Sequence, residues 1–189
     1  TDRRLEAARS AGFTTAVTFP MTGIFAGQGA VINLAGEKAQ QMVVASPVGQ
    51  YLAFPASFGF GGGGGFPGSL MGVFAYISKM NIDADYCRQT RLEYEKRPAG
   101  ARRPEYDRAS EGWLESPRIL LPATRALEID RVLRLAADVK KPAVVYGAHE
   151  GYNAVELLKK AGAPVLVSLK WPERSRDADP DAPEILRVL

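Results

Sequence analysis

The 189-residue chain is poor in the two side chains that most often hold zinc: it has one cysteine, Cys87, and one histidine, His149. A single cysteine cannot form a disulfide within the chain, and together the two residues cannot complete a structural Cys/His zinc cluster, which takes four ligands. Nothing around Cys87, in a predicted helix, indicates an activated thiolate. These absences exclude a disulfide scaffold and leave the compartment, cytoplasmic or periplasmic, open.

Long apolar runs and a strong charge of one sign are also missing. No run approaches the roughly 20 apolar residues that cross a bilayer, and the opening TDRRLEAARSAG does not read as a signal peptide. The net charge is only +3, and the one basic cluster, Lys96 to Arg103, also carries prolines, which is typical of a solvated loop. We therefore predict a globular protein with neither a membrane nor a nucleic-acid partner.

Glycine is abundant at one place, the run Gly59–Gly68 (GFGGGGGFPG), which contains a G-x-G-x-x-G match. A dinucleotide-binding loop needs these glycines directly between a buried strand and a helix, and Pro67 interrupts the run. No Gly-Lys-Ser/Thr follows, so a Walker loop is excluded as well. We interpret the run as an active-site or surface loop, and a self-contained α/β module that binds nucleotides through it remains the weakest alternative.

The stretch Lys141–Lys170 predicts a strand, a helix and a second strand. Two apolar runs, Ala143–Tyr146 and Pro164–Leu169, flank a segment with helical periodicity that Gly162 can end in the left-handed conformation. Because both runs are nearly continuous, they are typical of parallel strands covered on both faces. A similar unit precedes it, with a buried strand at Arg118–Leu121 and a helix that Thr124 can cap.

The first part of the chain predicts a different organisation. We expect a helix that ends at Gly12, a loop over Met21–Gly29, and long helices from a Ser69 cap to Arg97. The strands expected here lie at Phe13–Phe19, Ala30–Leu34, Gln41–Ala45 and Gln50–Phe54. The short spacings between the last three predict antiparallel hairpins rather than helical crossovers.

Three stretches carry a resemblance to a known family: AARSAGFTTAVTFPMTGIFAGQGAVINLAGE, FPGSLMGVFAYI and GAHEGYNAVELLKKAGAPVLVSLKWPERSRDADP. In their order the chain resembles the amidohydrolase superfamily, and within it the imidazolonepropionase-like enzymes of bacteria, as an interior piece. The resemblance implies a metal-dependent hydrolase with a zinc-like divalent metal in the parent protein. It also implies a small-molecule substrate, in which the enzyme cleaves a carbon–nitrogen bond other than a peptide bond, often in a cyclic amide.

The fold class implied is α/β, a partial (β/α) TIM-like barrel with a small antiparallel β elaboration. We predict a single domain over 1–189, with a helix, a strand and antiparallel hairpins in 1–58, the glycine-rich loop and long helices in 59–117, and βα units in 118–189. Barrel closure removes sheet edges, so an isolated piece keeps them and is expected to form a homo-oligomer.

The family places a His-x-His pair on its first barrel strand, single histidines on the fifth and sixth, and an aspartate on the eighth. The first pair and the last aspartate would lie outside this segment. Pro122 stands about where the fifth-strand histidine would be, and the sixth-strand histidine would fall near Tyr146 or Gly147, two or three residues before His149. The resemblance thus implies no complete metal site in this segment and an inactive segment, and it leaves a catalytically inactive scaffold or binding protein as the alternative.

His149 is the candidate catalytic residue, either as a ligand or in proton transfer, and the alternative is a loop histidine bonded to the backbone. Arg125 and Lys170, each just past a strand, could bind a substrate carboxylate or could simply be solvated. Glu150 is more simply a residue of a helix N-terminus. Ser168 has no histidine base and no G-x-S-x-G elbow, which disfavours a serine hydrolase.

Overall fold

The computed structural model describes residues 3–36, 38–54, 67–100 and 102–167. They belong to two compact units, Thr1–Pro117 and Arg118–Leu189, and each unit is described by itself. The boundary falls where the βα units were expected to begin, while the prediction of one domain over the whole chain stays a prediction. Residues 55–66 of the glycine-rich region, and with them the nucleotide-binding alternative, lie outside the described residues.

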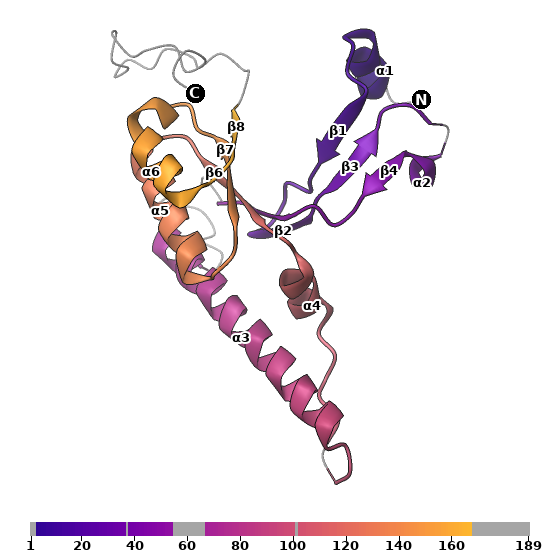
Figure 1. The fold of residues 1–189 in the computed structure, drawn as a ribbon, viewed down its shortest axis with the longest axis vertical. Helices are drawn as coiled ribbons and strands as arrows, with labels where there is room; N and C mark the ends of the chain where they lie inside the picture. Colours follow the sequence, from indigo (N-terminus) through magenta and orange to yellow (C-terminus); the bar gives the residue numbers. More distant parts are fainter. Residues whose placement is uncertain (1–2, 37, 55–66, 101, 168–189) are drawn as a thin grey trace. The chain divides into compact units, whose positions relative to one another are not determined.

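The first unit begins with a small antiparallel sheet (Figure 1). Its middle strand pairs antiparallel with both of its neighbours. Gly12, with φ +91°, ends the first helix as predicted, because a left-handed residue there costs glycine little. The elements of this part are α1 (Arg3–Ser10), β1 (Thr15–Thr18), β3 (Ala30–Asn33), α2 (Ala39–Met42) and β4 (Val43–Ala45), with sheet order β1-β3-β4.

Two strands of the first unit correct the predictions made for this region. The expected loop Met21–Gly29 contains a strand, β2 (Phe25–Gln28), which pairs antiparallel with β5 (Gln50–Leu52). The expected hairpin between Gln41–Ala45 and Gln50–Phe54 is therefore wrong, because β4 pairs with β3 instead.

Backbone hydrogen bonds at Gly29 explain the switch between sheets. The Gly29 N–H donates to the Gly49 carbonyl at 2.8 Å, and the Val48 N–H donates to the Gly29 carbonyl at 3.0 Å. These bonds extend the β2–β5 ladder past the strand ends. The chain after Pro47 therefore pairs with the β2 segment and not with β4. Local spacing predicts which segments can pair, but pairing partners distant in sequence decide which do.

Two helices complete the first unit, α3 (Leu70–Lys96) and α4 (Arg108–Glu115). The Ser69 hydroxyl caps α3 by accepting the Gly72 N–H at 3.0 Å, as predicted. Val73 and Ile77 of α3 are fully buried. Although α3 has 27 residues, no helix in the described part of the chain combines enough length with enough apolar sequence to cross a membrane.

The second unit confirms the predicted βα repeats. Its strands run parallel in the order β6-β7-β8, and α5 packs on β6 and β7. The fully buried side chains include Ile119, Leu121 and Val145 from the strands and Ile129 from the helix. The elements are β6 (Ile119–Ala123), α5 (Ala126–Asp138), β7 (Ala143–Gly147), η1 (Gly151–Ala154), α6 (Val155–Ala161) and β8 (Val165–Val167). The class α/β with a parallel sheet is thus confirmed, and the barrel remains a proposal.

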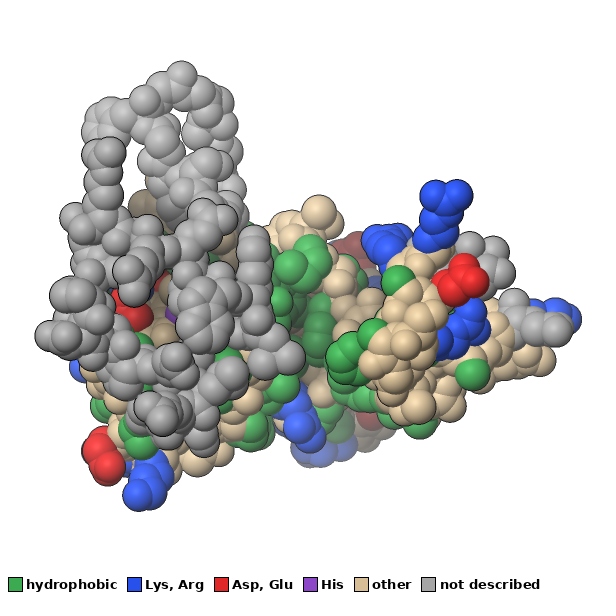
Figure 2. Space-filling model, turned by 90° about the horizontal axis from the view of Figure 1, so that it is seen from above, with side chains coloured by type: hydrophobic (Ala, Val, Ile, Leu, Met, Phe, Trp, Pro, Cys, Tyr) green, Lys and Arg blue, Asp and Glu red, His purple; other side chains and the backbone are tan. Residues whose placement is uncertain are grey.

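Two details of this unit differ from expectation. Tyr146 and Leu166 are paired neighbours on β7 and β8, and they are 42% and 44% exposed. The described residues therefore do not cover these strands on both faces. The cap residue of α5 is Arg125 rather than Thr124, and the Glu128 carboxylate accepts the backbone N–H groups of both. Hydrophobic side chains also reach the surface in Figure 2, as they do in most folded proteins.

Candidate functional site

The carboxyl ends of β6 and β7 lie next to each other in the second unit, with Ala123 in register with Gly147. The Ala148 N–H donates to the Ala123 carbonyl at 2.7 Å, and the Glu150 N–H donates to the Thr124 carbonyl at 2.9 Å. These bonds fix the turn after β7 against the turn after β6. In α/β proteins, substrates bind at this end of parallel strands.

The turn that leaves β7 has an unusual backbone. Gly147 has φ +100°, and a Cβ on it would lie 3.2 Å from the Ala123 carbonyl oxygen, so glycine is needed both for its conformation and for its size. Ala148 has φ +42° although it is not glycine, and it is fully buried. Strained residues of this kind are concentrated at functional sites, and this one directly precedes His149. No sequence pattern predicted the left-handed backbone conformation of Ala148.

His149 is half-buried in this turn, and its Nδ1 atom is buried with no hydrogen-bond partner among the described residues. A buried ring nitrogen without a partner costs about 1–3 kcal/mol, which a ligand or a water bonded to it would recover. The alternative prediction is a loop histidine bonded to the backbone. Within the part of the chain that the structure describes, the Nδ1 atom makes no such bond. The proposed role of His149 itself is untested by this geometry and stays a prediction.

The two carboxylates at this edge are engaged in holding the start of α5. Glu128 Oε2 accepts the N–H groups of Thr124 at 2.9 Å and Arg125 at 3.1 Å, and Glu150 Oε2 accepts the Ala126 N–H at 3.3 Å. Partial burial opposes ionisation of Glu128, but the bonds from the backbone of Thr124 and Arg125 and from the Arg125 side chain outweigh it and lower its pKa. The sequence indicated a helix N-terminal role for Glu150 but not that the helix would be α5.

The two predicted substrate-binding cations have different outcomes. Arg125 lies at the same strand edge as His149, 68% exposed, with its Nε atom 2.9 Å from Glu128 Oε1. Binding of a substrate carboxylate by Arg125 remains a prediction. Lys170, like Ser168, lies outside the described residues.

The side chains at the strand ends do not fit a metal ion by themselves. Among the described residues, no three His, Cys, Asp or Glu side chains come together in a way that could hold one. Pro122, Ala123 and Gly147, at the ends of β6 and β7, carry no donor atom in their side chains. A catalytic zinc takes about three protein ligands, so this edge supplies His149 at most.

No protein-family model and no curated protein sequence matches the chain. Among solved structures, the crystal structure of an amidohydrolase from Thermotoga maritima MSB8 is similar, with a TM-score of 0.79 and 21% sequence identity. The match covers 93% of this chain and 47% of that one, so the chain spans about half the length of the similar protein. At this identity the likeness shows a shared fold.

Proposed function

We propose that the chain is part of an amidohydrolase-like protein that binds a small molecule at the carboxyl ends of β6 and β7. The whole protein would hydrolyse a carbon–nitrogen bond other than a peptide bond, as in the cyclic amides that imidazolonepropionase-like enzymes act on. The observation that supports this proposal is the fold shared with the Thermotoga maritima amidohydrolase over 93% of the chain. A shared fold supports the class of reaction by analogy, and the residues at the site must supply the chemistry.

His149 has the chemistry that the proposal requires from this half of the protein. Its unpartnered Nδ1 can accept a hydrogen bond or hold a proton, and imidazole exchanges protons near neutral pH. In water attack on an amide carbon, such a group would take the proton of the water or give one to the leaving nitrogen. Arg125 would orient a substrate carboxylate by sharing its guanidinium between that group and Glu128. We assign no step to a metal, because the described residues do not supply its ligands.

The test uses the full-length protein and a panel of five- and six-membered cyclic amides. Metal content is measured by mass spectrometry, and hydrolysis by ring-opened product. We expect His149→Ala to lower kcat/KM by about 10²- to 10⁴-fold, the usual contribution of a proton-transfer residue. Asn153 is an exposed polar residue four positions after His149. The control variant Asn153→Ala should leave the rate unchanged. Absence of both bound divalent metal and hydrolysis in the unaltered protein would refute the enzymatic proposal.

The second candidate function is a catalytically inactive binding scaffold, and the presence of Pro122 and Gly147 at the strand ends favours it. Calorimetric titration of the same cyclic amides separates the two candidates. Binding without turnover, weakened by His149→Ala but not by Asn153→Ala, would support the scaffold. If no cyclic amide either binds or reacts, neither candidate stands.

A further inference from the structure

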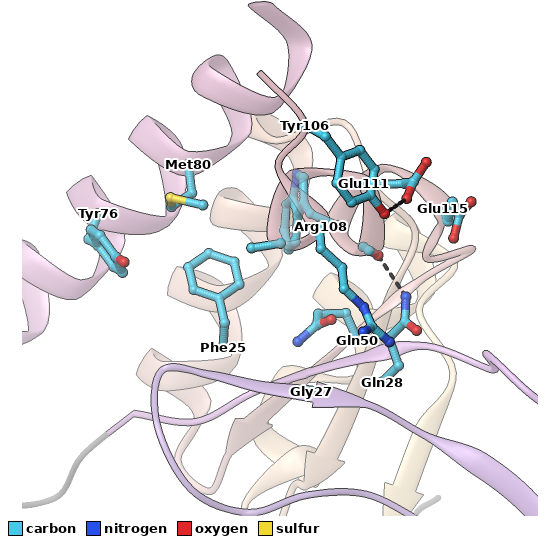
Figure 3. Close-up of a pocket in the computed structure, with 13 residues that line it drawn as sticks. Phe25, Gly27, Gln28, Gln50, Tyr76, Met80, Tyr106, Arg108, Glu111 and Glu115 are labelled. Atoms are coloured by element: carbon cyan, nitrogen blue, oxygen red, sulfur yellow. Dashed lines mark hydrogen bonds between the residues drawn. The ribbon is translucent and has the colours of Figure 1, made fainter. Parts of the chain in front are cut away.

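The first unit contains a pocket of about 730 Å³ that the sequence did not indicate (Figure 3). Its walls come from β2 and β5 on one side and from α3 and α4 on the other. All thirteen residues that line it are described ones and belong to the unit Thr1–Pro117. A volume in this range is typical of pockets that take small organic molecules.

Three aromatic rings form one wall of the pocket. The Phe25 ring lies edge-on to Tyr76, with centroids 5.8 Å apart, and edge-on to Trp113, with centroids 5.4 Å apart. Trp113 is 2% exposed, and its indole N–H donates to Asn81 Oδ1 at 2.9 Å, which fixes the ring. Met80 adds a soft apolar side chain beside them. This wall is preformed for a flat apolar group.

The opposite side of the pocket is polar and carries a cation. Arg108 extends from α4 toward Gln28 and Gln50 (Figure 3), and it makes no ion pair or hydrogen bond with any described residue. Gln50 is a polar side chain only 6% exposed, and Gln28 is held by its amide N–H on the Gly112 carbonyl at 2.8 Å. Arg108 itself is exposed, Gln50 is buried and Gln28 is half-buried. A guanidinium beside these amides, without an ion pair to a described residue, is suited to bind an anionic group.

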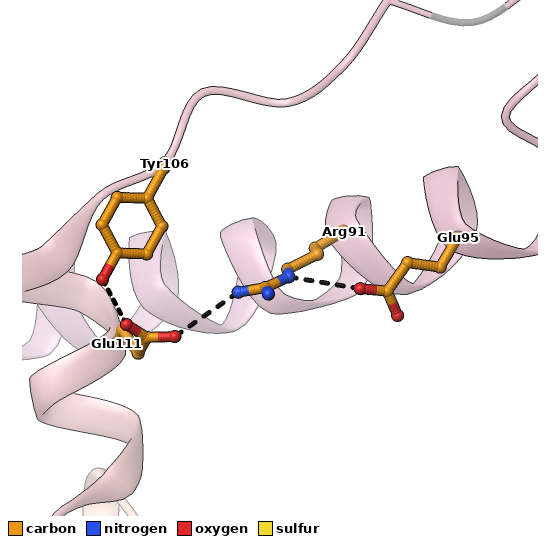
Figure 4. Close-up of polar contacts among 4 residues, drawn as sticks. All are labelled: Arg91, Glu95, Tyr106 and Glu111. Carbon is orange, nitrogen blue, oxygen red and sulfur yellow. Dashed lines mark hydrogen bonds and ion pairs between the residues drawn. The ribbon is translucent and has the colours of Figure 1, made fainter.

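Glu111, one of the acidic residues of the lining, already has partners (Figure 4). Glu111 accepts the Tyr106 hydroxyl and lies 3.4 Å from the Arg91 guanidinium, which also bonds Glu95 at 3.2 Å. The bond to Glu111 raises the pKa of Tyr106. Glu115 is exposed at the end of α4. Glu111 is therefore paired with Arg91 and Tyr106, and the exposed Arg108 has no ion pair among the described residues.

We propose that this pocket binds a small aromatic carboxylate, with the carboxylate on Arg108 and the ring against Phe25, Tyr76 and Met80. The site is distinct in its residues from the strand ends around His149, and it does not depend on the function proposed for them. Binding is a matter of charge and shape only, and no bond of the ligand is made or broken.

The test uses phenylacetate as the probe and calorimetric titration of the full chain. We expect binding in the millimolar range or tighter, and about tenfold weaker binding of 2-phenylethanol, which has the same ring and no charge. Arg108→Gln should weaken phenylacetate binding by about 10- to 100-fold, the usual loss of a charge-assisted hydrogen bond. Arg131→Gln, which removes an exposed arginine of α5, is the matched control and should change the affinity by less than about twofold.

Gln50→Leu tests the buried amide at nearly constant volume and should also weaken phenylacetate binding. Circular dichroism of each variant establishes that it is folded, and the comparison of the two probes on the unaltered chain remains decisive if a variant is not. The proposal is overturned if phenylacetate does not bind at 10 mM, if 2-phenylethanol binds equally well, or if Arg131→Gln weakens binding as much as Arg108→Gln.

Discussion

Glu128 shows how one side chain at the strand ends can be structural rather than catalytic. Its carboxylate joins the last residues of the β6 turn to the first turn of α5 through two backbone N–H groups and the Arg125 side chain. The same α5 N-terminus binds Glu150 through Ala126. Both glutamates therefore hold the turns that carry Arg125 and His149. Because their carboxylates are bonded to the backbone there, we assign neither of them an acid–base role.

The hydrogen bonds of Glu128 should make the free energy of unfolding depend on pH. The pKa of Glu128 is below the ordinary value of 4.5, so its ionised form stabilises the fold above about pH 4.5, and this stabilisation is lost as pH falls through the lowered pKa. We expect Glu128→Gln to have a smaller free energy of unfolding than the unaltered chain at about pH 7, and the difference to shrink at about pH 3. Urea unfolding of both proteins at both pH values measures this difference in the free energy of unfolding.

Glu105→Gln is the matched control, because Glu105 is an exposed glutamate of a loop with no ion pair among the described residues. Its effect on the free energy of unfolding should be small at both pH values. A Glu128→Gln effect that stays the same from about pH 7 to about pH 3 would contradict the role given to the ionised carboxylate.

At the residue scale, the predicted strand Ala143–Tyr146 correctly placed His149 after a strand. Sequence reasoning did not find the buried Nδ1 without a partner or the left-handed Ala148, because both depend on how the turn packs against Ala123. It also missed Arg108 and Gln50. These two residues are 58 positions apart in the sequence. Both line the pocket because β5 and α4 contribute to its walls.

At the scale of elements, glycines at helix ends were the most reliable signals. Gly12 and Gly162 both have positive φ, +91° and +59°, at the positions where the apolar periodicity ended. A glycine at a left-handed C-terminal position has a physical reason to be there, because any other L-residue would be strained. The same reasoning gives opposite expectations for two glycine substitutions.

Gly162→Ala should destabilise the chain by about 1 kcal/mol, because alanine is strained at φ +59°. Gly112→Ala should instead stabilise it by about 0.5–1 kcal/mol, because Gly112 lies inside α4 and a Cβ there would make ordinary contact with Gln28 Nε2 at 3.5 Å. Thermal and urea unfolding of both variants measure the two signs. Equal signs would show that local backbone conformation does not control these positions.

Strand pairing was the weakest part of the element predictions. Segment 25–28 has two glycine neighbours, Gly23 and Gly29, and no alternation of apolar and polar residues, yet it forms β2. The Phe25 ring between Tyr76 and Trp113, and the ladder to β5, supply the stabilisation that local sequence lacks. Both depend on residues 22 or more positions away in the sequence.

At the scale of the whole molecule, the parallel strands end at β8, which has a strand partner only on the β7 side among the described residues. Tyr146 and Leu166 expose apolar side chains beside this edge. An unpaired edge with exposed apolar residues favours association. A second copy of the chain that pairs with this edge would cover it.

We therefore expect the isolated 189-residue chain to form a dimer or a larger assembly. Light scattering coupled to size-exclusion chromatography should give a mass of at least about twice 20.4 kDa. Leu166→Lys should shift the distribution toward the monomer, because a charge on the β8 edge opposes pairing. Leu157→Lys, on α6 with a similar exposure of 40%, is the control. A monodisperse species of 20.4 kDa from the unaltered chain would contradict the expectation.

The sequence by itself determined the α/β class, the βα units of the second half, the helix caps at Ser69 and Gly162, and the position of His149 after a strand. All of these follow from periodicity and from backbone preferences that act within a few residues. The tertiary structure decided that β4 and β5 pair in different sheets, that Glu150 accepts a hydrogen bond from the start of α5, and that Arg108 lines a pocket with aromatic side chains. These features arise from contacts between residues far apart in the chain, and no local pattern encodes them.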